Sequence, residues 1–262
     1  EVRSVPGWEV GHNGLGRKAA LARSDGDAIG RFTARTHTPD RMVFASIGNF
    51  TARTAETVAQ RFFGGEPATT RTFSRTLPAA TEPFRKRLCK HTHQTHCILG
   101  CRAYGIGDER RLPLSLVVNI LGGPSANSLL NTVVREKHGL SYNIEASYTP
   151  YGGAGIVGVY FSSDHHRADR CIELIGEQLH RLRSEPLTAR RLSMAKRQFI
   201  AQLAISSESN ESYMLSAGKS LLTHDEIDTM EQVYAKVREL TAAQLTEVAE
   251  EVFSGMSRLL YK

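Results

Sequence analysis

The chain has 262 residues, of which 40% are hydrophobic and 23% charged, fractions that are ordinary for a folded globular protein and exclude intrinsic disorder as its main state. No apolar run approaches the roughly 18–20 residues that a membrane-spanning helix requires, so we expect no membrane partner. The formal net charge is +6, but Lys and Arg are scattered among acidic residues, which leaves nucleic-acid binding as an unfavoured alternative.

The first part of the chain, residues 1–65, carries only short elements. Pro39 stops the first helix, and Thr51 is a suitable N-cap for the last one. The predicted elements are a helix over 30–38, a strand over 42–47 and a helix over 51–63. Residues 66–83 then shift to Pro, Ala, Thr and Ser, a composition that predicts a linker.

The remaining part, residues 84–262, is more regular. Apolar residues recur at helical spacing in several windows, while β-branched and aromatic residues fill others. In chain order we predict one or two strands over 88–103, helices over 111–121 and 127–138, strands over 140–149 and 154–163, helices over 166–184, 188–205, 226–239 and 242–253, and a strand over 257–261. Helices beside hairpin strands indicate an α+β fold rather than an alternating parallel sheet.

Four cysteines occur, and none belongs to a Cys-x-x-Cys pair. Four in a chain of this length do not make a disulfide scaffold. We interpret Cys89, Cys97, Cys101 and Cys171 as reduced thiols in the core. The sequence begins at Glu1 without a charged and then apolar leader, so we expect a processed chain or a piece of a longer one, and a cytoplasmic location.

A run of His and Cys side chains offers potential zinc ligands, namely Cys89, His91, His93, His96, Cys97 and Cys101. Their spacing matches no closed zinc site, and we prefer a strand whose histidines face solvent and alternate with Thr92 and Thr95. We therefore expect no metal ligands in this chain. Another pair, His165-His166, follows Asp164, whose carboxylate we expect to cap the next helix.

A further constellation joins the end of a predicted helix to a predicted strand. Arg135 lies in the last turn of the helix, Gly139 is a good C-cap, and Tyr142 opens the strand. Such a turn can bring a guanidinium and a phenol to one side. Both groups are hydrogen-bond donors that can hold a carbonyl oxygen as it gains charge. The alternative is a surface arginine and a tyrosine at a sheet edge.

Two stretches carry a resemblance to a known family: NILGGPSANSLLN at 119–131 and VREKHGLSY at 134–142. Together they resemble the second half of the pitrilysin/insulinase-type zinc peptidases, family M16, and are most similar to bacterial members related to the mitochondrial processing peptidase. Further stretches agree with the family in order, at 38–49, 94–121, 151–160, 187–202 and 259–261, so the likeness covers roughly 30–262.

The resemblance implies a fold and a domain organisation. The fold is a two-layer α+β sandwich, with a mainly antiparallel sheet covered by helices on one face. Residues 1–65 correspond to the tail of an incomplete first domain, 66–83 to the linker and 84–262 to a complete second domain, the half that is often labelled the inactive peptidase domain.

The resemblance also implies roles for single residues. In such enzymes the first domain supplies an inverted zinc motif, HxxEH, whose Glu activates a zinc-bound water against a peptide carbonyl. The second domain contributes an Arg and a Tyr that bind substrate and support the reaction. Arg135 and Tyr142 match these positions, and Gly122 and Gly123 match a glycine-bearing loop near the substrate.

The chain departs from the family's catalytic pattern because it contains no HxxEH motif. We therefore expect zinc on a missing N-terminal catalytic half or on a partner chain that bears HxxEH, and no peptidase activity from this chain alone. Its expected function is to supply the substrate-binding half. The alternative is a non-catalytic partner or scaffold subunit of an M16-like complex, and a homodimer is also possible.

Overall fold

The structure is a computed structural model that describes residues 16–65, 82–89 and 91–262. The described residues fall into two compact units. Unit 1 comprises 82–200, without residue 90, and 234–262; unit 2 comprises 16–65 and 201–233. Residues 1–15 and most of the predicted linker, 66–81, lie outside the described part.

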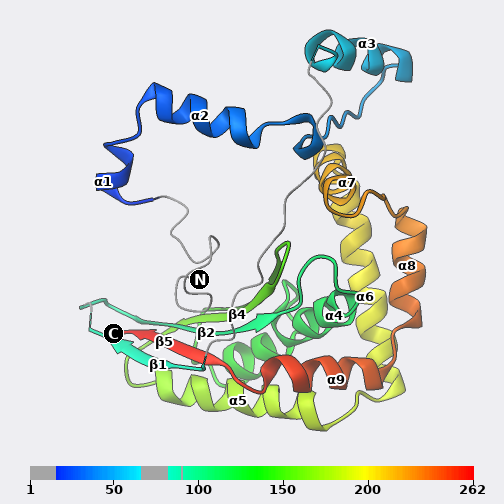
Figure 1. The fold of residues 1–262 in the computed structure, drawn as a ribbon. Coiled ribbons are helices and arrows are strands. Elements are labelled where there is room, and N and C mark those ends of the chain that lie inside the picture. Colours follow the sequence, from blue (N-terminus) through cyan, green and yellow to red (C-terminus); the bar gives the residue numbers. More distant parts are fainter. Residues whose placement is uncertain (1–15, 66–81, 90) are drawn as a thin grey trace. The chain divides into compact units, whose positions relative to one another are not determined.

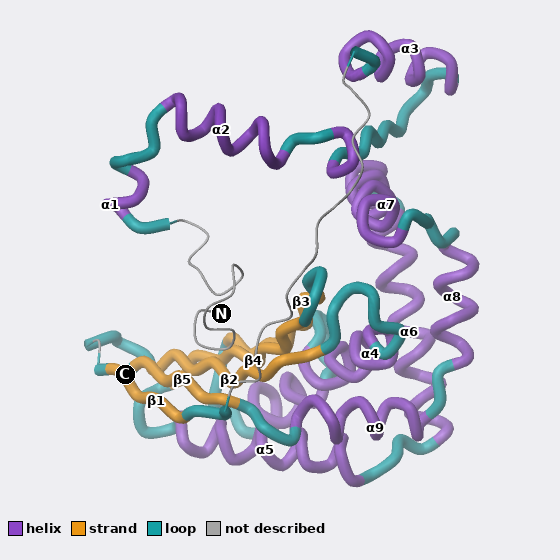
Figure 2. Tube along the Cα trace, in the orientation of Figure 1, coloured by secondary structure: helices purple, strands orange, loops and turns teal. Residues whose placement is uncertain are grey.

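Unit 1 is built on one five-stranded sheet with the strand order β1-β5-β2-β4-β3. The strands are β1 (Arg85–Leu88), β2 (Thr95–Ala103), β3 (Asn143–Pro150), β4 (Gly155–Ser163) and β5 (Ser257–Tyr261). Neighbouring strands are antiparallel except β1 and β5, which are parallel. Figure 2 shows the strands gathered into this sheet, with helices along one of its faces. The predicted two-layer α+β fold, with a mainly antiparallel sheet, is confirmed.

Three helices of unit 1 cover that face of the sheet (Figure 1). They are α4 (Arg111–Gly122), α5 (Ala168–Ser184) and α9 (Ala242–Phe253). The helix α9 begins with a capping box, in which Thr241 and Gln244 satisfy each other's backbone N–H groups. The three helices bury leucines, valines and isoleucines toward the sheet, which is the apolar stripe expected of a surface helix.

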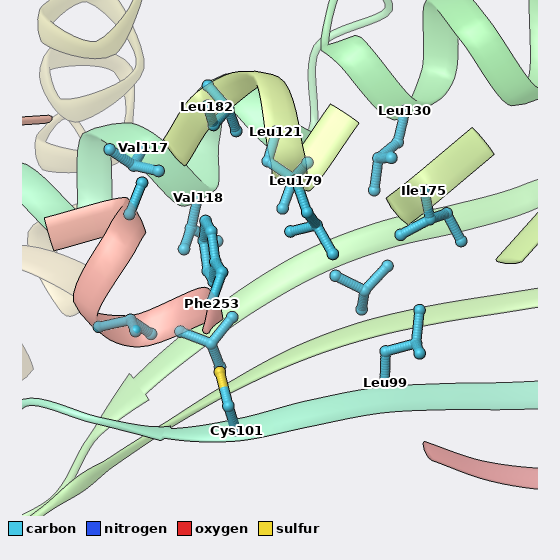
Figure 3. Close-up of a cluster of buried hydrophobic side chains, with 14 of the residues drawn as sticks. Leu99, Cys101, Val117, Val118, Leu121, Leu130, Ile175, Leu179, Leu182 and Phe253 are labelled. Atoms are coloured by element: carbon cyan, nitrogen blue, oxygen red, sulfur yellow. The ribbon is translucent and has the colours of Figure 1, made fainter. Parts of the chain in front are cut away.

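The core of unit 1 forms where these helices meet alternate residues of the central strands. In β2 the side chains of Cys97, Leu99 and Cys101 are buried, while Ile98 between them is exposed on the opposite face. The register pairs Leu99 with Val159 of β4, whose side chain is also fully buried. Figure 3 shows strand and helix side chains converging in this layer. Burial of this apolar layer is the main stabilising contribution to the unit.

The helices that follow α5 are α6 (Ala189–Ser207), α7 (Asn210–His224) and α8 (Met230–Glu239). The Ser209 side chain accepts a hydrogen bond from the N–H of Ser212 and so caps α7, which ends at Asp225 in the left-handed conformation. The predicted helices over 188–205 and 226–239 correspond to α6 and α8 with shifted ends, whereas α7 was not predicted. Among the described residues, no helix combines the length and hydropathy needed to cross a membrane.

Unit 2 begins with α1 (Lys18–Leu21), α2 (Gly26–Thr36), the 3-10 turn η2 (Pro39–Arg41) and α3 (Ala52–Phe63). The predicted N-cap of α3 is confirmed, because the Thr51 hydroxyl accepts a hydrogen bond from the N–H of Thr54. The predicted strand over 42–47 is wrong as an element of this structure. Residues 42–47 form no strand, and no described segment pairs with them.

The cysteine prediction holds for three of the four thiols. Cys97, Cys101 and Cys171 are free thiols buried in unit 1, as predicted. Cys89 is also free, but it is exposed after β1, so its placement in the core was wrong. It follows Leu88, the last residue of the edge strand β1.

Candidate functional site

The segment from Arg135 to Tyr142 runs from a helix through Gly139 toward strand β3, which begins at Asn143 rather than at the predicted Leu140, so Tyr142 directly precedes the strand. The helical segment is a π-helix, η3 (Asn131–Lys137), rather than a regular α-helix. Gly139 has φ +59°, the left-handed conformation that a residue without Cβ adopts at low cost. The N–H of Leu140 donates to the carbonyl oxygen of Val134 at 3.0 Å, closing the turn. π-helical turns are rare, and many lie at functional sites.

Three contacts hold this turn against the rest of unit 1. The Arg167 guanidinium Nη1 donates to the carbonyl oxygen of Gly139 at 3.2 Å. The thiol of Cys171 on α5 lies 3.9 Å from the carbonyl oxygen of Leu140. The buried hydroxyl of Ser141 donates to the carbonyl oxygen of Ser162 on β4 at 2.7 Å. The backbone between Arg135 and Tyr142 is therefore fixed before any ligand arrives.

The two side chains that flank this turn point into solvent. The Arg135 side chain is 52% exposed, and its Nε lies 3.7 Å from Glu136 Oε1, a loose ion pair at an exposed position. Tyr142 is 88% exposed, the most exposed of the large hydrophobic and aromatic residues described. Neither side chain contacts the other in a described hydrogen bond. The turn thus presents the Arg135 guanidinium and the Tyr142 hydroxyl to solvent, where both can donate hydrogen bonds.

Gly122 and Gly123 lie at the end of α4, where they are buried. A Cβ on Gly122 would stand 2.7 Å from the backbone nitrogen of Ala146 on β3, and a Cβ on Gly123 would stand 2.7 Å from the carbonyl oxygen of Asn119. Both distances are shorter than real Cβ contacts. Close packing of α4 against β3 therefore requires Gly122, and the end of the helix requires Gly123, independently of any ligand.

The predicted strand of solvent-facing histidines was partly wrong. β2 begins only at Thr95, so His91 and His93 precede it, and His91 has an unusual φ of +51°. Thr95, which was predicted to alternate with the solvent-facing histidines, is buried, and its hydroxyl lies 2.8 Å from His165 Nδ1. His96 lies on the sheet face opposite the helices, where its Nδ1 is 2.9 Å from the hydroxyl of Tyr160.

The described residues do not fit a zinc ion. No group of three or more His, Cys, Asp and Glu side chains converges in the described part of the chain. Burial raises the pKa of Cys97 and Cys101 to about 12.

The predicted capping role of Asp164 was also wrong. The helix α5 starts at Ala168, its N-cap residue is Arg167, and no side chain caps it. The Asp164 carboxylate lies 3.5 Å from Arg167 Nε instead. The same arginine donates to the carbonyl oxygen of Gly139. Asp164 therefore helps to orient Arg167 toward the turn between Arg135 and Tyr142 and does not cap the helix.

A polar depression lies beside the N-terminal end of α4, and none of its lining residues was predicted as a site residue. It measures about 650 Å³ and is lined by Gly105, Gly107, Asp108, Glu109, Arg110, Gly152 and Gly153. Arg110 forms ion pairs with Asp108 at 2.7 Å and with Glu251 at 2.9 Å, and its guanidinium carbon lies 4.2 Å from the centre of the Tyr104 ring. The sequence feature that could have indicated this depression is the group of glycines next to the run Asp108-Glu109-Arg110.

Comparison with known sequences gives a consistent set of relatives. A sequence model described as "Peptidase M16 inactive domain" matches residues 26–199. A protein named "Uncharacterized zinc protease YmxG" from Bacillus subtilis is 29% identical over 253 residues, 96% of this chain and 59% of that protein. The alpha subunit of mitochondrial-processing peptidase from Neurospora crassa is 24% identical over 196 residues, 70% of this chain and 33% of that protein.

Comparison with solved structures gives the same fold. A crystal structure of a peptidase M16 inactive domain from Pseudomonas fluorescens superposes with a TM-score of 0.90 at 20% identity, covering 99% of this chain and 62% of that one. A chain of complex III2 from Candida albicans superposes with a TM-score of 0.84 at 12% identity, covering 99% and 64%. The chain thus spans less than two thirds of the relatives and neighbours that it matches.

Proposed function

Because the chain belongs to the peptidase M16 family and carries its inactive domain, we propose that it is the substrate-binding, zinc-free half of a zinc metalloendopeptidase. The observation that carries this proposal is the rigid turn that exposes Arg135 and Tyr142. The catalytic zinc belongs to polypeptide outside this chain, on an N-terminal half or on a partner that bears HxxEH. The substrate is a peptide.

In this proposal Arg135 and Tyr142 bind the peptide backbone rather than activate water. The guanidinium of Arg135 donates N–H groups, and the phenol of Tyr142 donates its O–H, to carbonyl oxygens of the bound peptide. Donors fixed in place stabilise a carbonyl oxygen most where it gains negative charge, and loss of one such donor lowers kcat by about 10²–10³-fold. The contacts of Gly139 with Arg167 and of Ser141 with Ser162 fix the turn that carries them.

The proposal has a direct activity test. The chain is combined with the part of YmxG that lies outside the match, and cleavage of a mixed-sequence fluorogenic peptide is measured. Arg135→Ala and Tyr142→Phe should each lower kcat/KM at least tenfold while thermal unfolding stays unchanged. Arg190→Ala, which removes an exposed arginine on α6, is the matched control and should retain activity. Full activity in both site variants would overturn the assignment.

A non-catalytic subunit is the second candidate function. It is favoured by likeness to proteins whose names describe assemblies, a mitochondrial-processing peptidase subunit and complex III2. The mass and N-terminus of the native protein separate the two. A native chain that carries HxxEH upstream supports the peptidase half. A native chain that starts near Glu1 and purifies with another chain supports the subunit.

A further inference from the structure

One edge of the sheet in unit 1 carries a run of basic side chains. This edge is β1, which pairs with β5 on one side and with no described strand on the other (Figure 2). Its four residues read Arg-Lys-Arg-Leu. The opposite edge is β3, the strand that Tyr142 directly precedes. A strand at a sheet edge presents a row of N–H and C=O groups that can bind another extended segment.

Two backbone hydrogen bonds show which residues of β1 face β5. The N–H groups of Arg258 and Lys262 donate to the carbonyl oxygens of Phe84 and Leu88, at 2.7 Å and 3.0 Å respectively. Beside a parallel neighbour, alternate residues of a strand turn both backbone groups toward it, and the residues between them turn both groups away. The odd-numbered residues of β1 therefore direct their N–H and C=O groups toward the open edge.

These odd-numbered residues are Arg85 and Arg87, and both are exposed. Arg85 is registered opposite Arg258 of β5, and Arg258 is registered opposite Leu99 of β2, whose side chain is buried toward the helices. Because side chains alternate along a strand, Arg85, Arg87 and Arg258 lie on the same side of the sheet. Like charges opposite each other on neighbouring strands repel and destabilise the pair.

No described acidic side chain pairs with these three arginines. None of them takes part in an ion pair or a side-chain hydrogen bond within residues 16–65, 82–89 and 91–262. Burial raises the pKa of the Cys97 thiol, Arg258 lowers it and Asp169 of α5 raises it, so Asp169 acts on the same region without forming a salt bridge there. Positive charge and unused backbone groups thus coincide at this edge.

The charges determine which kind of segment this edge accepts. Arg85 and Arg87 would face like charges if β1 paired with β1 of a second copy, so they oppose self-association, a common protection of edge strands. The same two guanidinium groups attract a strand that carries carboxylates, because charge-assisted hydrogen bonds from arginine to carboxylate are strong. An acidic extended segment is therefore complementary to both the charge and the backbone of this edge.

We propose that β1 is a docking edge for an extended acidic segment of a partner protein, which adds to the sheet beside β1. The segment exchanges backbone hydrogen bonds with Arg85 and Arg87, and its Asp or Glu side chains pair with their guanidinium groups. Because β1 and β3 are opposite edges, a segment on β1 leaves Arg135 and Tyr142 accessible. The proposal holds whether or not these two residues act in a peptidase.

Peptide binding to the full chain tests the docking edge. The probe is a fluorescent peptide in which glutamate and valine alternate, and its affinity is measured by fluorescence anisotropy at low and at physiological salt. The acidic peptide should bind saturably, and more weakly as salt rises. A peptide in which lysine replaces glutamate should not bind. The acidic peptide N-methylated along its backbone keeps its charge but loses its N–H donors, and should bind at least tenfold more weakly.

Charge reversals in the chain locate the binding edge. Arg87→Glu should weaken binding of the acidic peptide at least tenfold. Arg190→Glu makes the same change of net charge at an exposed position of α6, so it is the matched control and should leave the affinity unchanged. Arg85→Glu should also weaken binding at least tenfold. Because it places a carboxylate opposite Arg258, it should unfold at or above the wild-type temperature, which shows that the loss of binding is not a loss of folding.

Three results would each overturn the proposal: no saturable binding of the acidic peptide, equal affinities for the N-methylated and unmethylated peptides, or equal affinities of the Arg87→Glu and Arg190→Glu variants. A single-stranded oligonucleotide that displaces the acidic peptide, and that Arg87→Glu no longer binds, would identify nucleic acid as the occupant instead. None of these measurements depends on the activity of the Arg135 and Tyr142 variants, so the two proposals fail independently.

Discussion

The hydroxyl of Ser141 donates a 2.7 Å hydrogen bond to the carbonyl oxygen of Ser162, and this buried contact ties the turn after Gly139 to strand β4. Ser141→Ala removes the donor and should lower the free energy of unfolding by about 1–2 kcal/mol. Ser147→Ala, at an exposed position of β3, should change it by less than about 0.5 kcal/mol. Urea unfolding of the three proteins checks the difference. Equal midpoints for Ser141→Ala and the wild type would show that the contact does not hold the turn.

Two glycine substitutions in unit 1 should change its stability in opposite directions. Gly122→Ala places a Cβ 2.7 Å from the backbone nitrogen of Ala146 and should destabilise unit 1 by about 1–3 kcal/mol. Gly176→Ala, in α5, meets nothing within 4 Å and should stabilise by up to about 1 kcal/mol because alanine favours the helix. Chemical denaturation measures both changes. A neutral Gly122→Ala would leave ligand contact as the reason for this glycine.

The thiols should differ sharply in reactivity. At pH 8 a thiol with a pKa near 12, as burial gives Cys97 and Cys101, is ionised in only about one molecule in 10⁴. Burial raises the pKa of Cys171 as well, whereas Cys89 is exposed. A disulfide-exchange reagent at pH 8 should therefore modify one thiol rapidly, and all four only in denaturant. Cys89→Ser should abolish the fast reaction. Rapid modification of a second thiol would contradict the buried placement.

The ion pair beside the polar depression should make stability depend on acid pH. Hydrogen bonds from Arg110 lower the pKa of Asp108. Its contribution to stability is then present above the unfolded pKa of about 4 and is lost as pH falls through the lower, folded value. Asp108→Asn should lower the unfolding free energy at pH 7 by up to about 1 kcal/mol, with the deficit shrinking toward pH 2. Glu109→Gln, at an exposed neighbouring position, is the control and should change the unfolding free energy at pH 7 by less than about 0.5 kcal/mol in thermal melts.

Much of unit 1 could be predicted because local pattern and burial agree there. The prediction of a helix over 111–121 corresponds to α4, and the predicted strand over 257–261 corresponds to β5. Each element buries its apolar side, so the sequence carries a readable stripe or alternation. The helix α7 was missed for the opposite reason. It buries no residue, so its apolar residues form no stripe that marks it.

The candidate site was predictable in its local part only. The left-handed cap at Gly139 follows from residue type, and the structure has it. The π-helical winding before it and the hydrogen bond from Arg167 to Gly139, 28 positions apart, depend on tertiary contacts that no local pattern reveals. The segment 42–47 shows the same limit, because a β pattern states a preference for pairing but does not supply the partner strand.

The position of strand β5 in the sheet also determines when the sheet can close during synthesis and folding. It lies between β1 and β2, and the N–H of Phe84 bonds to the Ser257 hydroxyl across 173 positions of the chain. During synthesis β2, β3 and β4 emerge long before β5, so the sheet has a gap beside β2 until Ser257–Tyr261 has been made. During that interval the nascent chain exposes the unpaired N–H and C=O groups of its strand edges, which chaperones would need to protect from aggregation. Closure of the sheet is a late, long-range event, and such topologies fold slowly.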